Sequence, residues 1–597
     1  LILTRCIRIS LCNRTTISGI KTIKKGMKKL LLSIAIVFLL LSCSTKIKVD
    51  LLVYNATIYT VDSLFSISEA MAVNDGKIVE TGRASDLQGK YDAKEKLDAQ
   101  GKFIYPGFID AHAHFVGYGQ SLFTVDLYDS KSMDEVVQRV KGFDSAHPNE
   151  TWILGRGWDQ NKFPGKTFPT NEELNKLFPG KPVLLERVDG HASIANDKAF
   201  ELAGVKAGDK IPGGEIETKN ARPDDPVGRG RLTGILIDNA VDLVSSKIPS
   251  PTPAKLKEAL MEAQKNCFAV GLTTIDDCGL SHEAISFIDS LQKTGDLKMR
   301  IYAMLSDAKA NYDFAFQKAR LSARAGTDGN DPVGQGKITT DRLHVCAFKV
   351  YADGALGSRG ACLLQPYSDK PGWSGFLLSS QQHFDSVAKV IYDHGWQMCT
   401  HAIGDSGNRT MLTIYGKYLK GKNDLRWRIE HAQVINENDF KLFGDYNVVP
   451  SVQPTHATSD MYWAGERLGP ERVKGAYAYK QLLEQNGWIP LGTDFPVEDI
   501  SPFKTFYAAV VRKDSKGWPS NGFQMENALT REETLRGMTI WAAKANFEET
   551  EKGSLEKGKF ADFVILDSDL VKEVPEKLLQ VKVLKTFVGG EKVYEMK

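Results

Sequence analysis

Short runs in which apolar and polar positions alternate occur near both ends of the chain. Residues 51–59 and 70–80 read as strands, and Asn74-Asp75-Gly76 between the halves of the second run is typical of a hairpin turn. Near the other end, residues 561–566 and 581–594 carry the same pattern, with a Gly-Gly turn inside the second run. Strands at both ends of a long body predict one small β-domain assembled from the two terminal regions.

Between these ends, strand-like runs alternate with amphipathic helical segments, as after residues 271–277 and 300–305. This alternation predicts an α/β fold of parallel βα units. Polar residues at several strand ends favour a TIM-like (β/α)8 barrel over an open sheet. Runs at 152–155 and 182–188 predict an α+β insertion with strands of its own. The predicted boundaries are 46–104 with 551–597 for the β-domain, 105–550 for the barrel domain and 117–250 for the insertion within it.

Histidines and one aspartate follow four of the apolar runs. An apolar strand predicted over residues 102–109 leads into His112 and His114, whose i, i+2 spacing would project both imidazoles from one face. Alone this pair is a weak signal, but further polar residues occupy matching positions. They are His401, His431 and Asp494. Neutral imidazoles with a carboxylate are ligands that a divalent cation such as zinc prefers, so the pattern predicts a metal site.

With these motifs the chain resembles the amidohydrolase superfamily, and most of all its amidohydrolase-3 branch of N-substituted formamide deformylase-like enzymes. The resemblance covers roughly residues 50 to 595. It implies a metal-dependent hydrolase barrel, and a composite β-sandwich built from both termini. The matching motifs are His112-x-His114 and the blocks 348–359, 400–405, 430–433 and 492–496.

Lys349 lies in the middle of the apolar run 343–351, where a lysine is costly unless it pairs or reacts. We expect burial to lower its pKa, and a neutral amine can add carbon dioxide to form a carbamate that bridges two metals. The resemblance implies this role, with His112 and His114 on one metal and His401 and His431 on the other. The alternatives are a lysine paired with an aspartate and a mononuclear zinc site.

Asp494 is the candidate for proton transfer, because a carboxylate beside a metal-activated water can accept a proton and pass it to the leaving group. The resemblance implies the same role. The alternative is that Asp494 only caps the following turn. His191 lies in an Asp-Gly-His-Ala block of the insertion and is assigned to catalysis through substrate contact or carbonyl polarisation. Further candidates for substrate binding are Trp158, Asp159 and Arg359.

The remaining motifs exclude several classes of enzyme. The glycine-rich stretches lack the Lys-Ser/Thr pair of a phosphate loop, and no Gly-x-Ser-x-Gly elbow for serine hydrolysis occurs. Six other histidines have no partner motif, so we expect them at the surface or in packing roles. They are His147, His282, His344, His383, His394 and His456.

The net charge of +2 depends on the N-terminal region of the 597-residue chain. Residues 1–42 carry eight Lys and Arg and no acid, so without them the charge falls to −6 and nothing indicates a nucleic-acid partner. Five cysteines follow Cys43 without a close pair, which indicates neither a disulfide framework nor a cysteine zinc site. The expected partner is a small-molecule substrate, and homo-oligomer formation stays open.

The N-terminal region reads as a targeting segment. Residues 27–42 form a charged start and an apolar run too short to span a bilayer, and Leu40-Leu41-Ser42-Cys43 resembles a bacterial lipobox. We expect Met27 to be the true start and residues 1–26 to be an upstream artefact. The mature protein would then be exported and lipid-anchored at Cys43, facing the periplasm or the outer surface. The alternatives are a plain secretory signal and an uncleaved anchor.

Replacement of Cys43 by alanine is expected to move the protein from the membrane to the soluble fraction, because the lipid-bearing residue is lost. Fractionation followed by immunoblotting measures this. An unchanged distribution would mean that the lipobox assignment is wrong.

Taken together, these patterns predict an enzyme that hydrolyses a carbon–nitrogen bond, other than a peptide bond, in a small amide-type substrate by attack of metal-bound hydroxide. It would use one or two zinc ions. The alternatives are hydrolysis of a cyclic amide, lactone or ester at the same site, and a lipid-anchored binding protein without turnover.

Overall fold

The computed structural model describes residues 46–219, 230–324 and 338–597. The predicted targeting segment and Cys43 therefore lie outside the described residues. Within the described ranges, no helix combines the length and the apolar character needed to cross a membrane.

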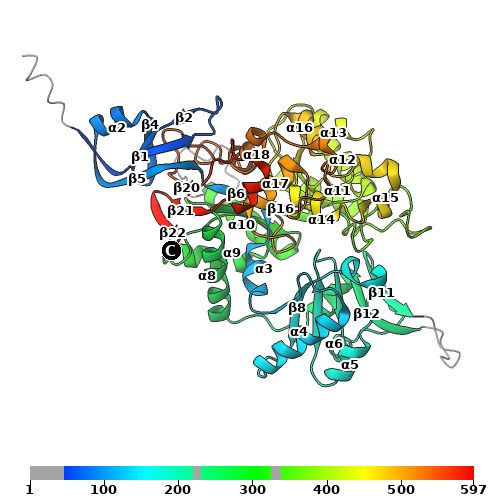
Figure 1. Ribbon diagram of the computed structural model, residues 1–597. Helices are drawn as coiled ribbons and strands as arrows, with labels where there is room; N and C mark the ends of the chain where they lie inside the picture. The colour runs from blue at the N-terminus through cyan, green and yellow to red at the C-terminus, as the bar shows by residue number, and fades with distance from the viewer. Residues whose placement is uncertain (1–45, 220–229, 325–337) are drawn as a thin grey trace, which may run out of the picture.

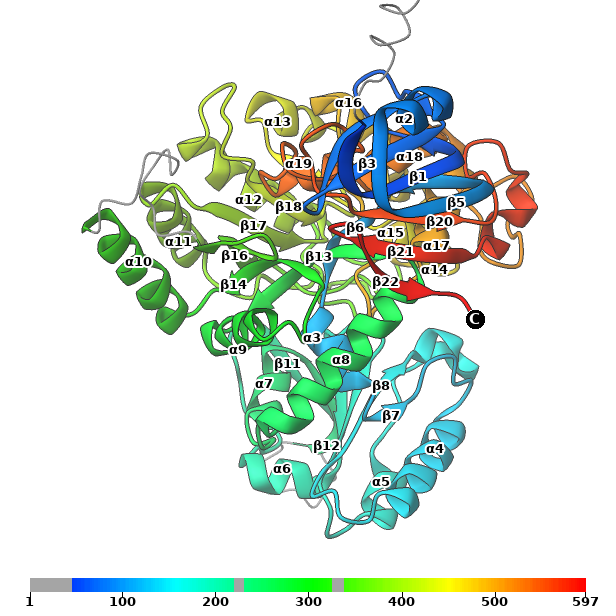
Figure 2. The same cartoon turned by 90° about the vertical axis from the view of Figure 1, so that its left-hand side faces the viewer.

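A parallel, barrel-like sheet forms the centre of the molecule (Figure 2). Residues 489–494 run between its two edge strands. On one side the amide of Ala111 donates to the carbonyl of Leu491 over 3.2 Å, and on the other the amide of Gly492 donates to the carbonyl of Val452 over 3.0 Å. In order around the sheet the strands are β6 (Phe108–Ala113), β13 (Leu272–Leu280), β14 (Arg300–Ser306), β16 (Leu343–Tyr351), β17 (Gln397–Ala402), β18 (Arg428–His431) and β19 (Val449–Ser451), with the short β15 (Ile338–Thr339) antiparallel to β16.

Helices follow most of these strands, and their apolar faces pack against the sheet. In α11 the buried side chains Phe384, Val387 and Ile391 recur at helical spacing, and Ser380 caps the first turn. The alternation predicted from the sequence is thus confirmed as a mixed α/β fold. The helices of this body are α3 (Phe115–Ser121), α8 (Pro253–Ala269), α9 (His282–Lys293), α10 (Lys309–Arg324), α11 (Gln381–Asp393), α12 (Asp405–Tyr418), α13 (Phe440–Asp445), α14 (Pro454–Asp460), α15 (Ala464–Arg472), α16 (Tyr479–Asn486), α17 (Pro502–Val511), α18 (Arg531–Gly537) and α19 (Ile540–Ala545).

A second sheet joins strands from both ends of the chain, which lie side by side in Figure 2. The predicted hairpin is present, with Asp75 and Gly76 in the left-handed region at φ 50° and 72°. The sheet contains β1 (Ile47–Tyr59), β2 (Ile67–Ser68), β3 (Ala70–Asn74), β4 (Lys77–Gly82), β5 (Tyr91–Pro106), β20 (Phe563–Leu566), β21 (Val583–Val588) and β22 (Glu591–Glu595), and α2 (Ala84–Lys90) lies between β4 and β5.

The single strand expected over residues 102–109 is two strands in two different sheets. Strand β5 ends at Pro106 in the two-ended sheet, and β6 begins at Phe108 in the barrel-like sheet. Gly107 separates them where the backbone passes Thr273 so closely that a Cβ atom would lie 2.3 Å from its Oγ1. Only glycine fits this crossing without rearrangement.

The predicted insertion has a sheet of its own, which lies beyond one end of the barrel-like sheet (Figure 1). Its buried core is separate from that of the barrel and includes Ile153, Leu185 and Ile237. In spatial order the strands are β11 (Gly214–Lys219), β12 (Arg231–Asp238), β10 (Ala192–Ala195), β9 (Val183–Arg187), β8 (Ile153–Trp158) and β7 (Val125–Asp126), with helices α4 (Met133–Ala146), α5 (Glu172–Leu177), α6 (Asp197–Ala203) and α7 (Asn239–Ser245).

Candidate active site

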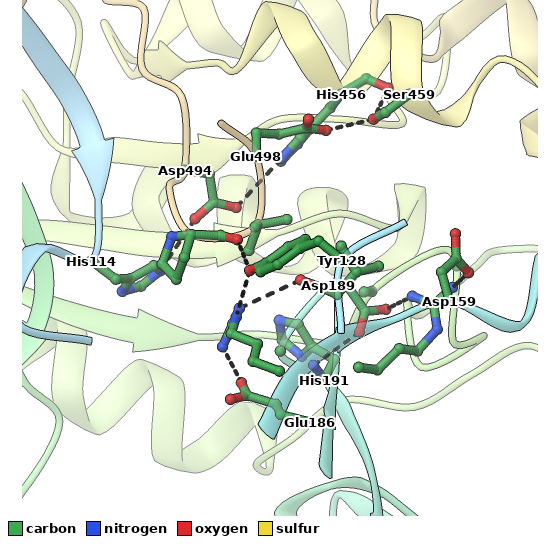
Figure 3. A pocket seen from close by; sticks show the side chains of 18 of the residues that line it. His114, Tyr128, Asp159, Glu186, Asp189, His191, His456, Ser459, Asp494 and Glu498 are labelled. Atoms are coloured by element: carbon green, nitrogen blue, oxygen red, sulfur yellow. Dashed lines mark hydrogen bonds and ion pairs between the residues drawn. The ribbon is translucent and has the colours of Figure 1, made fainter. Parts of the chain in front are cut away.

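A cavity of about 1030 Å³ lies between the carboxyl ends of the barrel-like strands and the insertion. The barrel side contributes His114, Lys349, His401, His431 and Asp494 to its wall, and the insertion contributes a second set of polar side chains. Figure 3 shows His114 and Asp494 of the first set, and Asp159 and His191 of the second. The insertion set includes Asp159, Arg187 and His191. Four of the strand-end residues predicted from the sequence, His114, His401, His431 and Asp494, thus meet at one cavity, whereas His112 is fully buried and does not line it.

The two histidines of the His-x-His motif converge on Asp494. His112 is on β6 and fully buried, whereas His114 has left the strand at the start of α3 and its side chain is 30% exposed. The Oδ1 atom of Asp494 lies 3.2 Å from His114 Nε2 and 3.6 Å from His112 Nε2. The Asp494 backbone is anchored by its amide, which donates to the carbonyl of His112 over 2.7 Å.

The donor atoms fit a divalent cation. Ligand atoms of His112, His431 and Asp494 all lie within 4.8 Å of one another, and all three side chains are buried. Burial lowers the pKa of His112 to about 4 and that of His401 and His431 well below the ordinary value. The three imidazoles are therefore neutral, which is the form that binds metals.

Hydrogen bonds orient two of these rings toward the centre. The Nδ1 of His112 donates to Glu430 Oε2 over 2.6 Å, and the Nδ1 of His431 donates to Gln453 Oε1 over 2.7 Å. Each bond leaves Nε2 as the nitrogen with a free lone pair. Buried acceptors of this kind commonly fix the tautomer of metal-binding histidines.

Lys349 projects from β16 into the same cluster, with its Nζ 3.3 Å from His112 Nε2. The expectation that burial lowers its pKa is wrong for this site. Burial alone would do so, but Cys278, Tyr351 and Glu430 together raise the pKa of Lys349 above its ordinary value. The amine is therefore charged at neutral pH. A cation bound beside it would repel this charge and favour the neutral amine.

Asp494 is held ionised. Burial would raise the pKa of its carboxyl, but the hydrogen bond from His114 outweighs burial and the pKa lies well below the ordinary value. The residue also has a φ of 64°, a left-handed conformation that is uncommon outside glycine. Such local strain often occurs where a side chain is aimed at a site.

His401 lies between the cluster and the insertion. Its ring centroid is 4.5 Å from that of His431 and 4.7 Å from that of His191. Its Nε2 is 3.5 Å from the carbonyl oxygen of Gly354. The histidines therefore form a continuous row from the barrel to the insertion.

His191 is the insertion's contribution to this row. Its Nδ1 donates to Asp238 Oδ1 over 2.7 Å, and the side chain is 16% exposed. Burial lowers the pKa of the ring, but the hydrogen bond to Asp238 and its charge raise it above the ordinary value. Asp159 also lines the cavity, where it pairs with Arg187 at 2.6 Å.

Two residues predicted to bind substrate are not in the cavity wall. Trp158 is buried in the core of the insertion, where its indole Nε1 donates to the carbonyl of Leu185 over 2.8 Å. Arg359 pairs with Asp369 at 2.8 Å outside the cavity. The two adjacent residues differ because β8 ends at Trp158, which packs in the core of the insertion, whereas Asp159 follows the strand and lines the cavity. We therefore assign neither Trp158 nor Arg359 to substrate contact.

The sequence analysis also missed His456, for which it predicts a surface or packing role. It lines the cavity, and its Nε2 lies 3.5 Å from Asp494 Oδ2 (Figure 3). The available signal was its position shortly after the apolar run that forms β19, near the carboxyl end of a strand as are His401 in β17 and His431 in β18. Glu430 gave no signal of its own, because its role depends on the Nδ1 of His112.

Comparisons with known proteins agree with this site. The amidohydrolase family model matches residues 95–594. YtcJ of Bacillus subtilis, named as an amidohydrolase, is 30% identical over 90% of this chain and 98% of its own. N-substituted formamide deformylase of Arthrobacter pascens is 26% identical over 92% of this chain and 98% of its own.

A solved structure of an uncharacterized metal-dependent hydrolase from Pyrococcus horikoshii OT3 is also similar. It superimposes with a TM-score of 0.68 at 26% identity, covering 88% of this chain and 99% of that one. Together with the His and Asp cluster at the strand ends, the match over most of the chain establishes that this protein belongs to the amidohydrolase family of metal-dependent hydrolases.

Proposed function

We propose that the protein hydrolyses a carbon–nitrogen bond, other than a peptide bond, in a small amide-type substrate. The observation that carries the proposal is the buried cluster of His112, His431 and Asp494, which opens into a large cavity. Amide hydrolysis needs a Lewis acid that polarises the carbonyl group and a group that transfers a proton to the leaving nitrogen. The histidines of this cluster are suitable ligands for a metal ion in the first role, and the carboxylate of Asp494 suits the second. The similarity to N-substituted formamide deformylase supports the choice of bond.

The metal would be held by His112, His114, His401 and His431, with Lys349 between them as a carbamate. Zinc fits neutral imidazoles and oxygen donors, and one or two ions are consistent with this set. A bound cation supplies Lewis-acid polarisation and lowers the pKa of water. We also propose that residues 489–494 complete the barrel-like sheet as an eighth strand, which would make it a (β/α)8 barrel.

Different residues of the chain would transfer the proton and bind the substrate. Asp494, ionised at neutral pH, accepts a proton from the attacking water and delivers it to the leaving nitrogen. His191 contacts the substrate's carbonyl group from the insertion side of the cavity. The surrounding protein would exclude bulk water and strengthen both interactions.

Purified protein loaded with zinc is expected to hydrolyse members of a panel of N-formyl and N-acyl amines, and to lose this activity after chelation. Re-addition of zinc should restore turnover, as measured by release of the free amine. Faster turnover of esters, lactones or cyclic amides would replace the proposed bond with those substrates. Absence of both bound metal and turnover would instead indicate a binding protein.

A further inference from the structure

We propose that Asp238, a residue of the insertion, is a positioning residue that holds the His191 ring so that its Nε2 faces the cavity. The inference rests on the proposed function, since His191 would then present a fixed polar atom to the substrate from the wall across from the barrel. Figure 3 shows His191 on the insertion side of the cavity and Asp494 on the barrel side.

Two bonds tie the segments of these residues together. The Oδ1 of Asp238 accepts from His191 Nδ1 over 2.7 Å, and the backbone amide of Asp238 donates to the carbonyl of His191 over 2.8 Å. With Nδ1 engaged, Nε2 is the only ring nitrogen left to contact a ligand. The carboxylate therefore selects which edge of the imidazole faces the cavity.

The environment of Asp238 lowers the stability of the folded protein, which argues against a purely structural role for this residue. Its side chain is fully buried, and Oδ2 has no hydrogen-bond partner among the residues that the structure describes. A buried carboxylate oxygen without a hydrogen-bond partner lowers the stability of the folded protein. Its presence here therefore indicates that the carboxylate is retained for a function. The backbone adds to this cost, because φ and ψ are 52° and −127° in a residue that is not glycine.

The loop after β16 leaves room for this carboxylate only because it carries glycine at two positions. A Cβ atom on Gly354 or on Gly360 would lie 2.2 Å from Asp238 Oδ2. Gly354 also places its carbonyl 3.5 Å from His401 Nε2. The insertion's aspartate thus docks into a cradle formed by the barrel beside the histidine row.

Packing makes the orientation of His191 sensitive to this contact. Its ring lies against that of His401 at a centroid distance of 4.7 Å. This contact limits the tilt of the ring but leaves a flip about the Cβ–Cγ bond, which exchanges the position of Nδ1 with that of Cδ2 and the position of Nε2 with that of Cε1. The bond to Asp238 is the contact that distinguishes the two orientations. Its loss should therefore misdirect the ring without displacing the metal-binding residues.

The test uses full-length, zinc-loaded protein with four changes: Asp238→Ala, Asp238→Asn, His191→Gln, and Asp238→Ala combined with His191→Gln. With the best substrate of the panel, Asp238→Ala is expected to lower kcat about 10- to 100-fold while bound zinc stays at the parental level. Asp238→Asn should recover part of this loss, because its amide oxygen can still accept from Nδ1. The double variant should be no slower than His191→Gln alone, since both changes remove one function. Additive losses, or loss of zinc in Asp238→Ala, would overturn the proposal.

A second measurement does not need turnover. In protein carrying ¹⁵N-labelled histidine, the Nδ1 proton assigned to His191 by its absence in His191→Gln should disappear in Asp238→Ala. Its persistence would overturn the positioning role even if the enzyme is active. If no substrate is found but the proton behaves as expected, the proposed function fails while the positioning role stands. Asp242→Asn, on the same helix start and away from the cavity, is the matched control and should leave both readouts unchanged.

Discussion

Replacement of Lys349 by alanine is expected to remove bound metal and activity together. The lysine is buried on β16 with its Nζ 3.3 Å from His112 Nε2, at the centre of the predicted ligands. If its carbamate bridges two ions about 3.5–4 Å apart, no other side chain can replace the bridging oxygens. The measured metal content should then fall from two ions per chain toward none, and turnover should become undetectable. A short carboxylic acid added with bicarbonate is expected to restore part of both.

The raised pKa of Lys349 predicts when its carboxylation occurs relative to metal binding. The amine must lose its proton before it can react with carbon dioxide, so carboxylation should accompany metal loading and not precede it. Mass spectrometry under native conditions should show the added mass only in the loaded protein. Lys162→Ala is a matched control, because Lys162 lines the same cavity but pairs with Asp129 at 2.8 Å. An active preparation with one metal per chain and an unmodified Lys349 would contradict the binuclear model.

Replacement of Asp494 by asparagine is expected to separate metal binding from chemistry. The amide is nearly isosteric and can still accept from His114, so zinc content should stay near normal. Without a proton acceptor, kcat should fall by at least ~10²-fold, as is typical of a lost acid–base group. Asp499→Asn on the cavity rim, where Asp499 pairs with Lys504, is the matched control.

The pH dependence tests the same assignment. Because its neighbours hold the pKa of Asp494 well below the ordinary value, the carboxylate stays ionised at neutral pH and gains a proton only in acid. A bound cation would lower this pKa further. The kcat/KM of the parent enzyme should therefore decline on the acidic side, and the residual activity of Asp494→Asn should lack that limb. Full activity in the variant would transfer the proton role to His191 or to the metal site.

The convergence of the strand-end residues could be predicted from sequence because it follows from topology. The carboxyl ends of parallel strands meet at one face, so His401 near the end of β17 and Asp494 at the end of the last apolar run had to approach His112. What the sequence could not give were properties that depend on several distant segments. The raised pKa of Lys349 reflects Glu430 on another strand, and the pairing of His191 with Asp238 needs the insertion's own sheet.

The errors among the candidate residues have the same origin. Trp158 and Asp159 are adjacent in sequence, yet one is in the insertion's core and the other faces the cavity. His456 has no flanking motif, yet helix α14, which follows β19, brings it to Asp494. Sequence motifs identified the residues at strand ends well, but they identified the residues on an intervening helix and on the insertion poorly.

The sheet shared by the two ends of the chain determines when the protein can complete its folding during biosynthesis. Strand β5 has its outer edge covered by β20, and the hydroxyl of Tyr105 bonds to Asp569, 464 positions further along the chain. Until the ribosome has released those last strands, the early ones present an open edge that can pair with other chains. The protein should therefore fold only after its synthesis is complete, and variants shortened before β20 should aggregate instead of accumulating as a trimmed but active enzyme.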